Sequence, residues 1–304
     1  RKGAAKAAAP PPAPEALAPE APPERDEAVA VAERMASAQR EISVSEFFTK
    51  NRHLLGFDNP RKALLTAVKE AVDNSLDACE EAGILPEVEV VIRPVEGYED
   101  RFQVVVEDNG PGIVKDQIPQ IFAKLLYGSK FHRLRMSRGQ QGIGISAAGM
   151  YAQLTTGQPV QITSRISPRR PAHHYAVAIN TQKNEPEIVR EETAKDWARP
   201  RGTRVELVIE AKYQRGRLSV DDYLAQTAIA NPHVEIRYEA PDGEKLEFAR
   251  GTKEMPRPAK EIKPHPYGVE LGTLIRMLRD TKARRVAAFQ AYARQLYAAH
   301  LTRL

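Results

Sequence analysis

The sequence predicts an α+β protein, folded as a two-layer α/β sandwich. Helical and strand patterns are mixed between about Ser43 and Ala249. They do not follow the strict strand–helix–strand order of a doubly wound parallel sheet. The chain is 42% hydrophobic and 28% charged, which is typical of a soluble globular protein with a buried core. No run of 18 apolar residues occurs, so we expect no membrane partner.

Composition divides the chain into three parts. Residues 1–40 are dominated by Ala, Pro and Glu, have little to bury, and are predicted to be disordered. Residues 41–255 carry the folded domain. Four prolines from Pro256 to Pro266 mark a linker, and two basic helices are predicted after it, within residues 256–304. The chain starts with Arg1 and stops directly after a helical pattern, so we expect it to be part of a longer protein.

The C-terminal part is strongly basic, which makes a polyanion such as nucleic acid a candidate partner. Between Arg257 and Leu304 there are ten Lys or Arg residues and three Asp or Glu residues. An ordinary solvated helix face is the alternative, because aromatic residues for base stacking are sparse there. Cys79 is the single cysteine of the chain, so no internal disulfide can form, and a buried thiol in a reducing cytoplasm is expected.

Strand and helix signals place the elements in order. Strand signals are apolar runs bounded by turn residues, and helix signals are caps followed by apolar periodicity. Helices are predicted at Ser45–Leu55, Pro60–Ala82, Asp116–Gly128, Ile145–Leu154 and Ser219–Asn231; strands are predicted at Val88–Val95, Arg101–Asp108, Pro159–Ile166, His173–Asn180 and Gly202–Glu210, with a hairpin at Val234–Ala249.

The helix at Pro60–Ala82 has two faces. Asn59 can cap it, Pro60 suits its first turn, and Gly83 can end it. At roughly 100° per residue, an apolar stripe can face a core, and a polar stripe runs beside it. The apolar stripe is Leu65, Val68, Val72, Leu76 and Cys79; the polar stripe is Glu70, Asp73, Asn74 and Asp77. The polar stripe is either a solvated face or the wall of a site.

A second candidate lies at the end of a buried strand, in "VVVEDNGPGI" (Val104–Ile113). Asp108 stands where the strand stops, and Gly110 and Gly112 allow a ligand to approach the backbone closely. The alternative is a tight surface turn, for which Asp-Asn-Gly is common.

The third candidate is the glycine-rich stretch "GSKFHRLRMSRGQQGIGISAAGM" (Gly128–Met150), which leads into an apolar helix. Bare amides, a helix N-terminus and nearby cations are typical of phosphate-binding loops, and Lys130 and Arg138 supply the cations. The hexapeptide Gly142–Ala147 fits the dinucleotide pattern G-x-G-x-x-A. It does not follow a strand directly, so it does not favour a Rossmann fold. The P-loop pattern is absent from the sequence.

Together these motifs carry a family resemblance. Glu-x-x-x-Asn on a helix, Asp-x-Gly-x-Gly about thirty residues later and a glycine-rich lid after about thirty more resemble the GHKL ATPases, which share the Bergerat fold. Three segments are similar in sequence to the B subunits of type IIB DNA topoisomerases (topoisomerase VI). They are "SEFFTKNRHLLGFDNPRKAL", "AVKEAVDNSLDACEEAGILP" and "SRGQQGIGISAAGMYAQLTTG". The similarity extends from about Ser43 to the end of the chain.

The resemblance implies roles for individual residues. Glu70 is the implied general base, Asn74 the implied Mg²⁺ ligand, and Asp108 the implied acceptor for the adenine amino group of ATP. Thr203 is implied to help hold the adenine, and Asp73 and Asp77 are expected either to be structural or to support the residues that contact the ligand. The remaining implied nucleotide-binding residues are Gly110 and Gly112 at the base, and Ser129, Lys130, Arg138, Gly139, Gln140, Gln141, Gly142, Ile143, Gly144 and Ile145 around the triphosphate.

The resemblance also implies an assembly and a mode of action on DNA. ATP binding pairs two B subunits, with Ser43–Phe57 as the exchanged strap. This pairing captures double-stranded DNA, and a tyrosine of a separate A subunit cuts it within a heterotetramer of two A and two B subunits. Such a protein is cytoplasmic and associated with the nucleoid. Residues 256–304 resemble the start of a helix-two-turn-helix domain, and the lysine-bearing transducer domain lies beyond this chain.

The rival hypotheses are another GHKL ATPase, such as a chaperone or kinase, and a non-enzymatic nucleic-acid-binding module.

Overall fold

The structure is a computed structural model that describes residues 43–125, 127, 138 and 143–258, with isolated positions at 35, 270–272, 275 and 279. The chain divides into two units, Arg1–Ile42 and Ser43–Leu304, and the fold below is that of the second unit. Apart from the isolated positions and residues 256–258, the predicted disordered tail (1–40) and the predicted linker and helical piece (256–304) lie outside the described residues.

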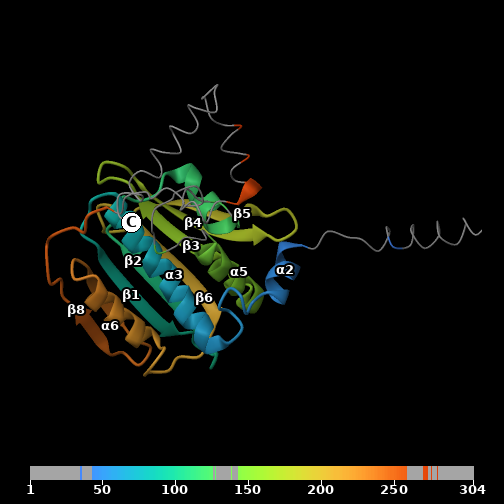
Figure 1. The fold of residues 1–304 in the computed structure, drawn as a ribbon, viewed down its shortest axis with the longest axis horizontal. Coiled ribbons are helices and arrows are strands. Elements are labelled where there is room, and N and C mark those ends of the chain that lie inside the picture. Colours follow the sequence, from blue (N-terminus) through green and yellow to red (C-terminus); the bar gives the residue numbers. More distant parts are fainter. Residues whose placement is uncertain are drawn as a thin grey trace, which may run out of the picture. The chain divides into compact units, whose positions relative to one another are not determined.

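The fold is built on one eight-stranded mixed sheet (Figure 1). Its strand order is β5-β4-β3-β6-β2-β1-β7-β8. All neighbours are antiparallel except β1 and β7, which run parallel. The strands are β1 (Glu87–Pro94), β2 (Arg101–Asp108), β3 (Val160–Arg165), β4 (Ala172–Asn180), β5 (Glu185–Ala194), β6 (Gly202–Glu210), β7 (Glu235–Glu239) and β8 (Lys245–Phe248).

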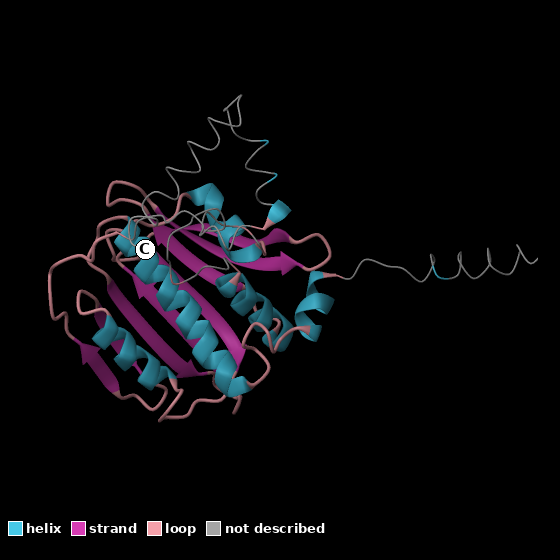
Figure 2. Cartoon of the chain, viewed as in Figure 1, coloured by secondary structure: helices cyan, strands magenta, loops and turns pink. Residues whose placement is uncertain are grey.

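The long helices lie together on one face of this sheet, as Figures 1 and 2 show. They are α3 (Pro60–Glu81), α5 (Gly144–Thr156) and α6 (Val220–Ala230); the shorter ones are α2 (Val44–Lys50), the 3₁₀ turn η1 (Lys115–Gln117) and α4 (Ile118–Ala123). The predicted α+β two-layer sandwich is therefore confirmed. Among the helices of the described part, none is long and apolar enough to cross a membrane.

Helix α3 shows why this sequence folds in two layers. The Asn59 side chain accepts a hydrogen bond from Arg61 N at 2.9 Å, and Pro60 occupies the first turn, as predicted. The apolar stripe packs into the core with Val68, Val72 and Leu76 fully buried. At its start the buried face holds Ala63 and Leu64, whereas the predicted Leu65 is only partly buried.

Three elements differ from the sequence prediction. The helix expected at Ser45–Leu55 is shorter, because α2 ends at Lys50 and Asn51 has a non-helical backbone. The helix expected at Asp116–Gly128 is shorter, because α4 ends at Ala123 and Lys124 adopts an extended backbone. Strand β5 was not predicted. It is a sheet-edge strand exposed along nearly its whole length and carries five charged side chains, so it lacks the apolar alternation that indicates a half-buried strand.

The segment Ser43–Phe57 packs on its own chain. Phe48 and Phe57 are buried, and the ring of Phe57 stacks on Tyr151 of α5 with the ring centroids 5.0 Å apart. Tyr151 is thus a core residue, as the sequence indicated. The role of this segment as an exchanged strap stays a prediction, because the structure holds one chain.

Gly202, the first residue of β6, lies where a side chain does not fit, and we predict that Gly202→Ala destabilises the fold severely. Its φ is +132°, and a Cβ there would lie 2.0 Å from the carbonyl oxygen of Asp108. Gly157 has a φ of +73° with open space around it, so Gly157→Ala is the matched control. We expect the control to lose about 1 kcal/mol of unfolding free energy from backbone strain, and Gly202→Ala to lose at least about twice that. Urea denaturation measures both, and equal losses would contradict the backbone contact.

Candidate functional site

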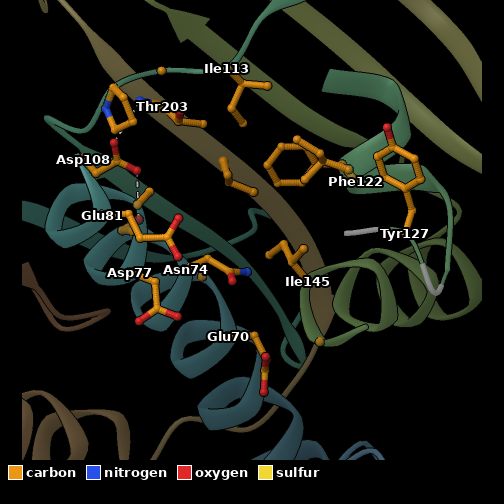
Figure 3. Close-up of a pocket in the computed structure, with 18 residues that line it drawn as sticks. Glu70, Asn74, Asp77, Glu81, Asp108, Ile113, Phe122, Tyr127, Ile145 and Thr203 are labelled. Atoms are coloured by element: carbon orange, nitrogen blue, oxygen red, sulfur yellow. Dashed lines mark hydrogen bonds between the residues drawn. The ribbon is translucent and has the colours of Figure 1, made fainter. Parts of the chain in front are cut away.

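A cavity of about 280 Å³ opens between α3, the end of β2 and the start of α5. Polar groups line the α3 side, and apolar side chains line the opposite wall (Figure 3). The apolar wall is formed by Ile113, Ile121, Phe122, Ile145 and Val205. A pocket of this kind suits a flat, partly apolar ligand whose polar groups are read by a few fixed partners.

Helix α3 presents one row of polar side chains to this cavity. Glu70, Asn74, Asp77 and Glu81 all line it, since they are three or four residues apart. Figure 3 shows Glu70 at one end of this row, far from Asp108, with Asn74 between them. Three of the four residues of the polar stripe therefore line a cavity. Asp73 lies on the side of this row and instead joins α3 to α6, because Tyr223 Oη donates to it at 2.9 Å and Lys69 Nζ contacts it at 2.8 Å.

Asp108 closes the far end of the cavity and is almost fully buried. Its Oδ1 accepts hydrogen bonds from the backbone N–H of Gly110 at 2.8 Å and of Thr203 at 3.1 Å. Its Oδ2 accepts one from Ser75 Oγ at 2.9 Å. Burial raises the pKa of Asp108 to about 6, although these three hydrogen bonds work in the opposite direction.

The loop after Asp108 is held by a buried serine of β3. Ser164 Oγ accepts a hydrogen bond from Ile113 N at 2.8 Å and lies 3.1 Å from Thr203 Oγ1. Gly112 has a φ of +73°, and a Cβ there would lie 2.2 Å from the carbonyl oxygen of Arg165. The loop therefore passes so close to β3 that only glycine fits at this position. The close contact of Gly112 is with the β3 backbone, and the predicted approach of a ligand to Gly110 and Gly112 stays a prediction.

Glu70 meets the first residue of α5 at the other end of the cavity. A Cβ on Gly144 would lie 1.7 Å from Glu70 Oε2, so the carboxylate rests against the Gly144 backbone. The N-cap residue of α5 is Ile143, whose side chain cannot cap the helix. The first amides of this 13-residue helix thus face the same cavity as Glu70, and helix N-termini favour anions.

The oxygen-bearing side chains of the cavity fit a metal ion that is coordinated mainly by a bound phosphate compound and by water. In the described ranges, no group of three or more His, Cys, Asp or Glu residues could hold a metal by itself. Asn74 nevertheless offers a carboxamide in the cavity, one helical turn from Glu70. Mg²⁺ prefers hard oxygen ligands. Few of these come from the protein, and the others are phosphate oxygens and water molecules.

Arg138 lies against α3 and α6. Its guanidinium donates to both carboxylate oxygens of Glu80 at 2.8 Å, to Asp77 at 3.1 Å and to Asn231 Oδ1 at 2.6 Å. The Glu80 carboxylate also lies 2.8 Å from Nε2 of buried His233. Burial opposes the ionisation of Glu80, but the hydrogen bonds from Arg138 and His233 outweigh it and lower the pKa of this carboxyl.

The structure thus brings Glu70, Asn74, Asp108, Gly112, Gly144, Ile145 and Thr203 to one cavity. Gly110 donates to Asp108, Ile143 precedes α5, and Arg138 contacts Asp77 and Glu80. The predicted residues Ser129, Lys130, Gly139, Gln140, Gln141 and Gly142 lie outside the described residues.

Sequence reasoning missed Ser75 and Glu81 on α3 as well as Ile121, Phe122 and Tyr127 across the cavity. The helical spacing indicates Glu81, four residues after Asp77, but nothing local marks the apolar wall.

The fold and this cavity define an ATPase domain of the GHKL class. Residues 59–213 match the family described as "Histidine kinase-, DNA gyrase B-, and HSP90-like ATPase". This match covers the cavity-lining residues from Glu70 to Val205.

Curated relatives narrow the class. The chain is 57% identical over 267 residues to a protein of Methanococcoides burtonii that is named as the B subunit of type 2 DNA topoisomerase 6, and the match covers 88% of this chain. It is 56% identical over 256 residues, or 84% of this chain, to the protein of the same name from Archaeoglobus fulgidus. The chain belongs to the family of type 2 DNA topoisomerase 6 B subunits. It spans 42% of the length of both relatives.

A solved structure, the MutL ATPase domain of Aquifex aeolicus complexed with ADP, matches with a TM-score of 0.40 and 20% identity over 62% of this chain and 64% of that one. This weak likeness adds nothing to the assignment.

The raised pKa of Asp108 predicts that its ionisation costs stability. The unfolded carboxyl, with its ordinary pKa of 3.8, loses its proton before the folded one, whose pKa is about 6. The stabilising contribution of this group is therefore present below about pH 4 and is lost as the pH rises through 6. We expect the unmodified chain to lose about 3 kcal/mol relative to Asp108→Asn between pH 4 and pH 7. Urea denaturation across this range measures the difference, and parallel pH curves would refute it.

Proposed function

We propose that this chain is the ATP-binding and ATP-hydrolysing part of a type IIB topoisomerase B subunit. One observation carries the proposal: a buried acceptor, Asp108, and the pair Glu70 and Asn74 line the same cavity, with Asp108 and Glu70 at its opposite ends. This arrangement suits the two ends of a nucleoside triphosphate, which has a base at one end and phosphates at the other. Membership in the B-subunit family supports the same assignment.

Asp108 is the proposed base-recognition residue. When it is ionised, its carboxylate accepts hydrogen bonds and cannot donate them. It therefore suits the 6-amino group of adenine, which donates, and disfavours the 6-oxo group of guanine, which accepts. The backbone between Gly110 and Gly112 and the side chain of Thr203 border the position of the base. The apolar side chains Ile113 and Val205 cover its faces.

The N-terminal end of α5 is the proposed phosphate site. Residues Ile143 to Ile145 offer backbone amides beside Glu70, and the positive end of the helix dipole lies there. In this proposal the loop before α5 completes the site with Ser129, Lys130, Arg138, Gly139, Gln140, Gln141 and Gly142. Without a nucleotide, the Arg138 guanidinium is held by Asp77 and Glu80.

Glu70 is the proposed general base. Its carboxylate accepts a proton from a water molecule, and the oxygen of that water attacks the terminal phosphorus while the bond to the bridging oxygen of ADP breaks. Asn74 supplies one oxygen ligand to Mg²⁺, which neutralises charge on the phosphate oxygens when it is bound. Gly144 allows the start of α5 to lie against Glu70 and thereby keeps the base and the phosphate site together.

Hydrolysis in this proposal serves a DNA gate. Binding of ATP pairs two B subunits, the closed pair holds a DNA duplex, and release of the products resets it. An A subunit supplies the DNA-cleaving tyrosine in a heterotetramer of two A and two B subunits, and the protein acts in the cytoplasm on nucleoid DNA. In this proposal a lysine of a transducer domain completes the phosphate site, and hydrolysis without that lysine is expected to be slow.

Calorimetry of ATP binding tests the assignment directly. We expect micromolar, Mg²⁺-dependent binding to the intact chain and its loss in Asp108→Ala, because that variant has no acceptor for the adenine amino group. The control is Asp100→Ala, which removes an exposed carboxylate just before β2, outside the cavity. DNA binding without any nucleotide binding would favour a nucleic-acid-binding module instead.

Glu70→Ala in the full-length protein separates binding from chemistry. We expect it to bind ATP and to dimerise with ATP as the unmodified protein does. Its steady-state phosphate release should fall at least about a hundredfold, because a positioned general base contributes that much or more. Turnover near the unmodified rate would remove Glu70 from this role, whereas lost binding would mean that it holds the nucleotide.

A further inference from the structure

Ser75 has an unusual environment for a helical serine. It follows Asn74 on α3, is buried and lines the cavity. Serine hydroxyls within helices often bond to the carbonyl one turn earlier. Here Ser75 Oγ donates across the cavity wall to Asp108 Oδ2 at 2.9 Å, joining residues that are 33 positions apart.

This hydrogen bond decides which acceptor site of Asp108 is left for a ligand. A carboxylate has about four acceptor positions, two on each oxygen. The two on Oδ1 are taken by the N–H groups of Gly110 and Thr203. Ser75 takes one on Oδ2, so one acceptor position of Oδ2 is left at the cavity surface.

We propose that Ser75 is a positioning residue for base selection, whose hydroxyl fixes the Asp108 carboxylate so that the last acceptor position of Oδ2 faces a 6-amino purine. The inference rests on the proposed function. Ser75 itself touches Asp108 and acts on the base through it. Without the hydroxyl, Oδ2 has two open positions, and the carboxylate is held on one side only.

The same hydroxyl favours the ionised form of Asp108. The hydrogen bond from Ser75 lowers the pKa of Asp108 against the larger, opposite effect of burial. The Cys79 thiol on α3 lies beside Asp108, and Arg199 from the segment before β6 carries a charge that also lowers this pKa. Asp77 and Glu81 line the same cavity. Loss of Ser75 therefore leaves Asp108 protonated at higher pH. A protonated carboxyl can donate to a 6-oxo group.

The first experiment needs no nucleotide. The ¹³C carboxyl resonance of Asp108 is titrated in the intact chain and in Ser75→Ala, with labelled aspartate and Asp108→Asn for assignment. We expect the midpoint to rise by about one pH unit in Ser75→Ala. The matched control is Ser219→Ala, which removes another buried serine hydroxyl, the N-cap of α6, without a contact to Asp108. The control should keep the unmodified midpoint.

The second experiment measures selectivity. Calorimetry compares ADP with inosine diphosphate, which carries a 6-oxo group, at pH 6 and pH 8. We expect Ser75→Ala to weaken ADP binding about tenfold at pH 8, the value of one hydrogen bond to a charged group. At pH 6 its preference for ADP over inosine diphosphate should fall further than that of the unmodified chain. Ser219→Ala should keep both affinities.

The outcomes separate the two proposals. If the unmodified chain binds no ADP, the proposed function is overturned, and base selection by Ser75 falls with it. If the unmodified chain binds ADP but Ser75→Ala keeps the unmodified titration midpoint and the unmodified selectivity, only the role of Ser75 is overturned. A raised midpoint together with reduced selectivity supports it.

Discussion

The site depends on one buried carboxylate. Asp108 stands at the end of β2 and accepts hydrogen bonds from α3 through Ser75, from its own loop through Gly110 and from β6 through Thr203. Burying an ionisable group is costly, and here the hydrogen bonds only partly offset the effect of burial, since the pKa stays near 6. A position that costs stability in this way is characteristic of a residue kept for function.

Helix α3 links this carboxylate to the chemistry at the other end of the cavity. Its apolar stripe is fixed against the sheet by Val68, Val72 and Leu76, so the adjacent polar stripe has only one direction to face. A rigid helix then sets the separation between the base-recognition end and Glu70. Functional side chains carried on such an element are held more accurately than side chains on a loop. The phosphate end differs, because it combines α5 with a loop whose residues lie largely outside the described ranges.

Much of this arrangement could be predicted from the sequence. The cap at Asn59, the run of valines before Asp108 and the N-cap at Ser219 each act through neighbouring residues, so local patterns indicate them correctly. Strand β5 could not be predicted in this way. It forms because β4 offers it an edge, and an exposed edge strand needs no apolar alternation. The contacts of Arg138 with Asp77, Glu80 and Asn231 also escape local reasoning, since they join residues 58 to 93 positions apart.

By itself, the sequence determined most of the helices and strands (although not β5), the two faces of α3, and the family resemblance carried by Glu70, Asn74 and Asp108. Short-range forces govern these features, because caps, periodicity and turn chemistry act over a few residues. Only the tertiary structure decided that Ser75 bonds to Asp108, that Gly144 lies against Glu70 and that Ile113, Phe122 and Val205 form the apolar wall. Those contacts exist because a single sheet brings distant segments together, and packing of side chains from several elements has no signature in any one of them.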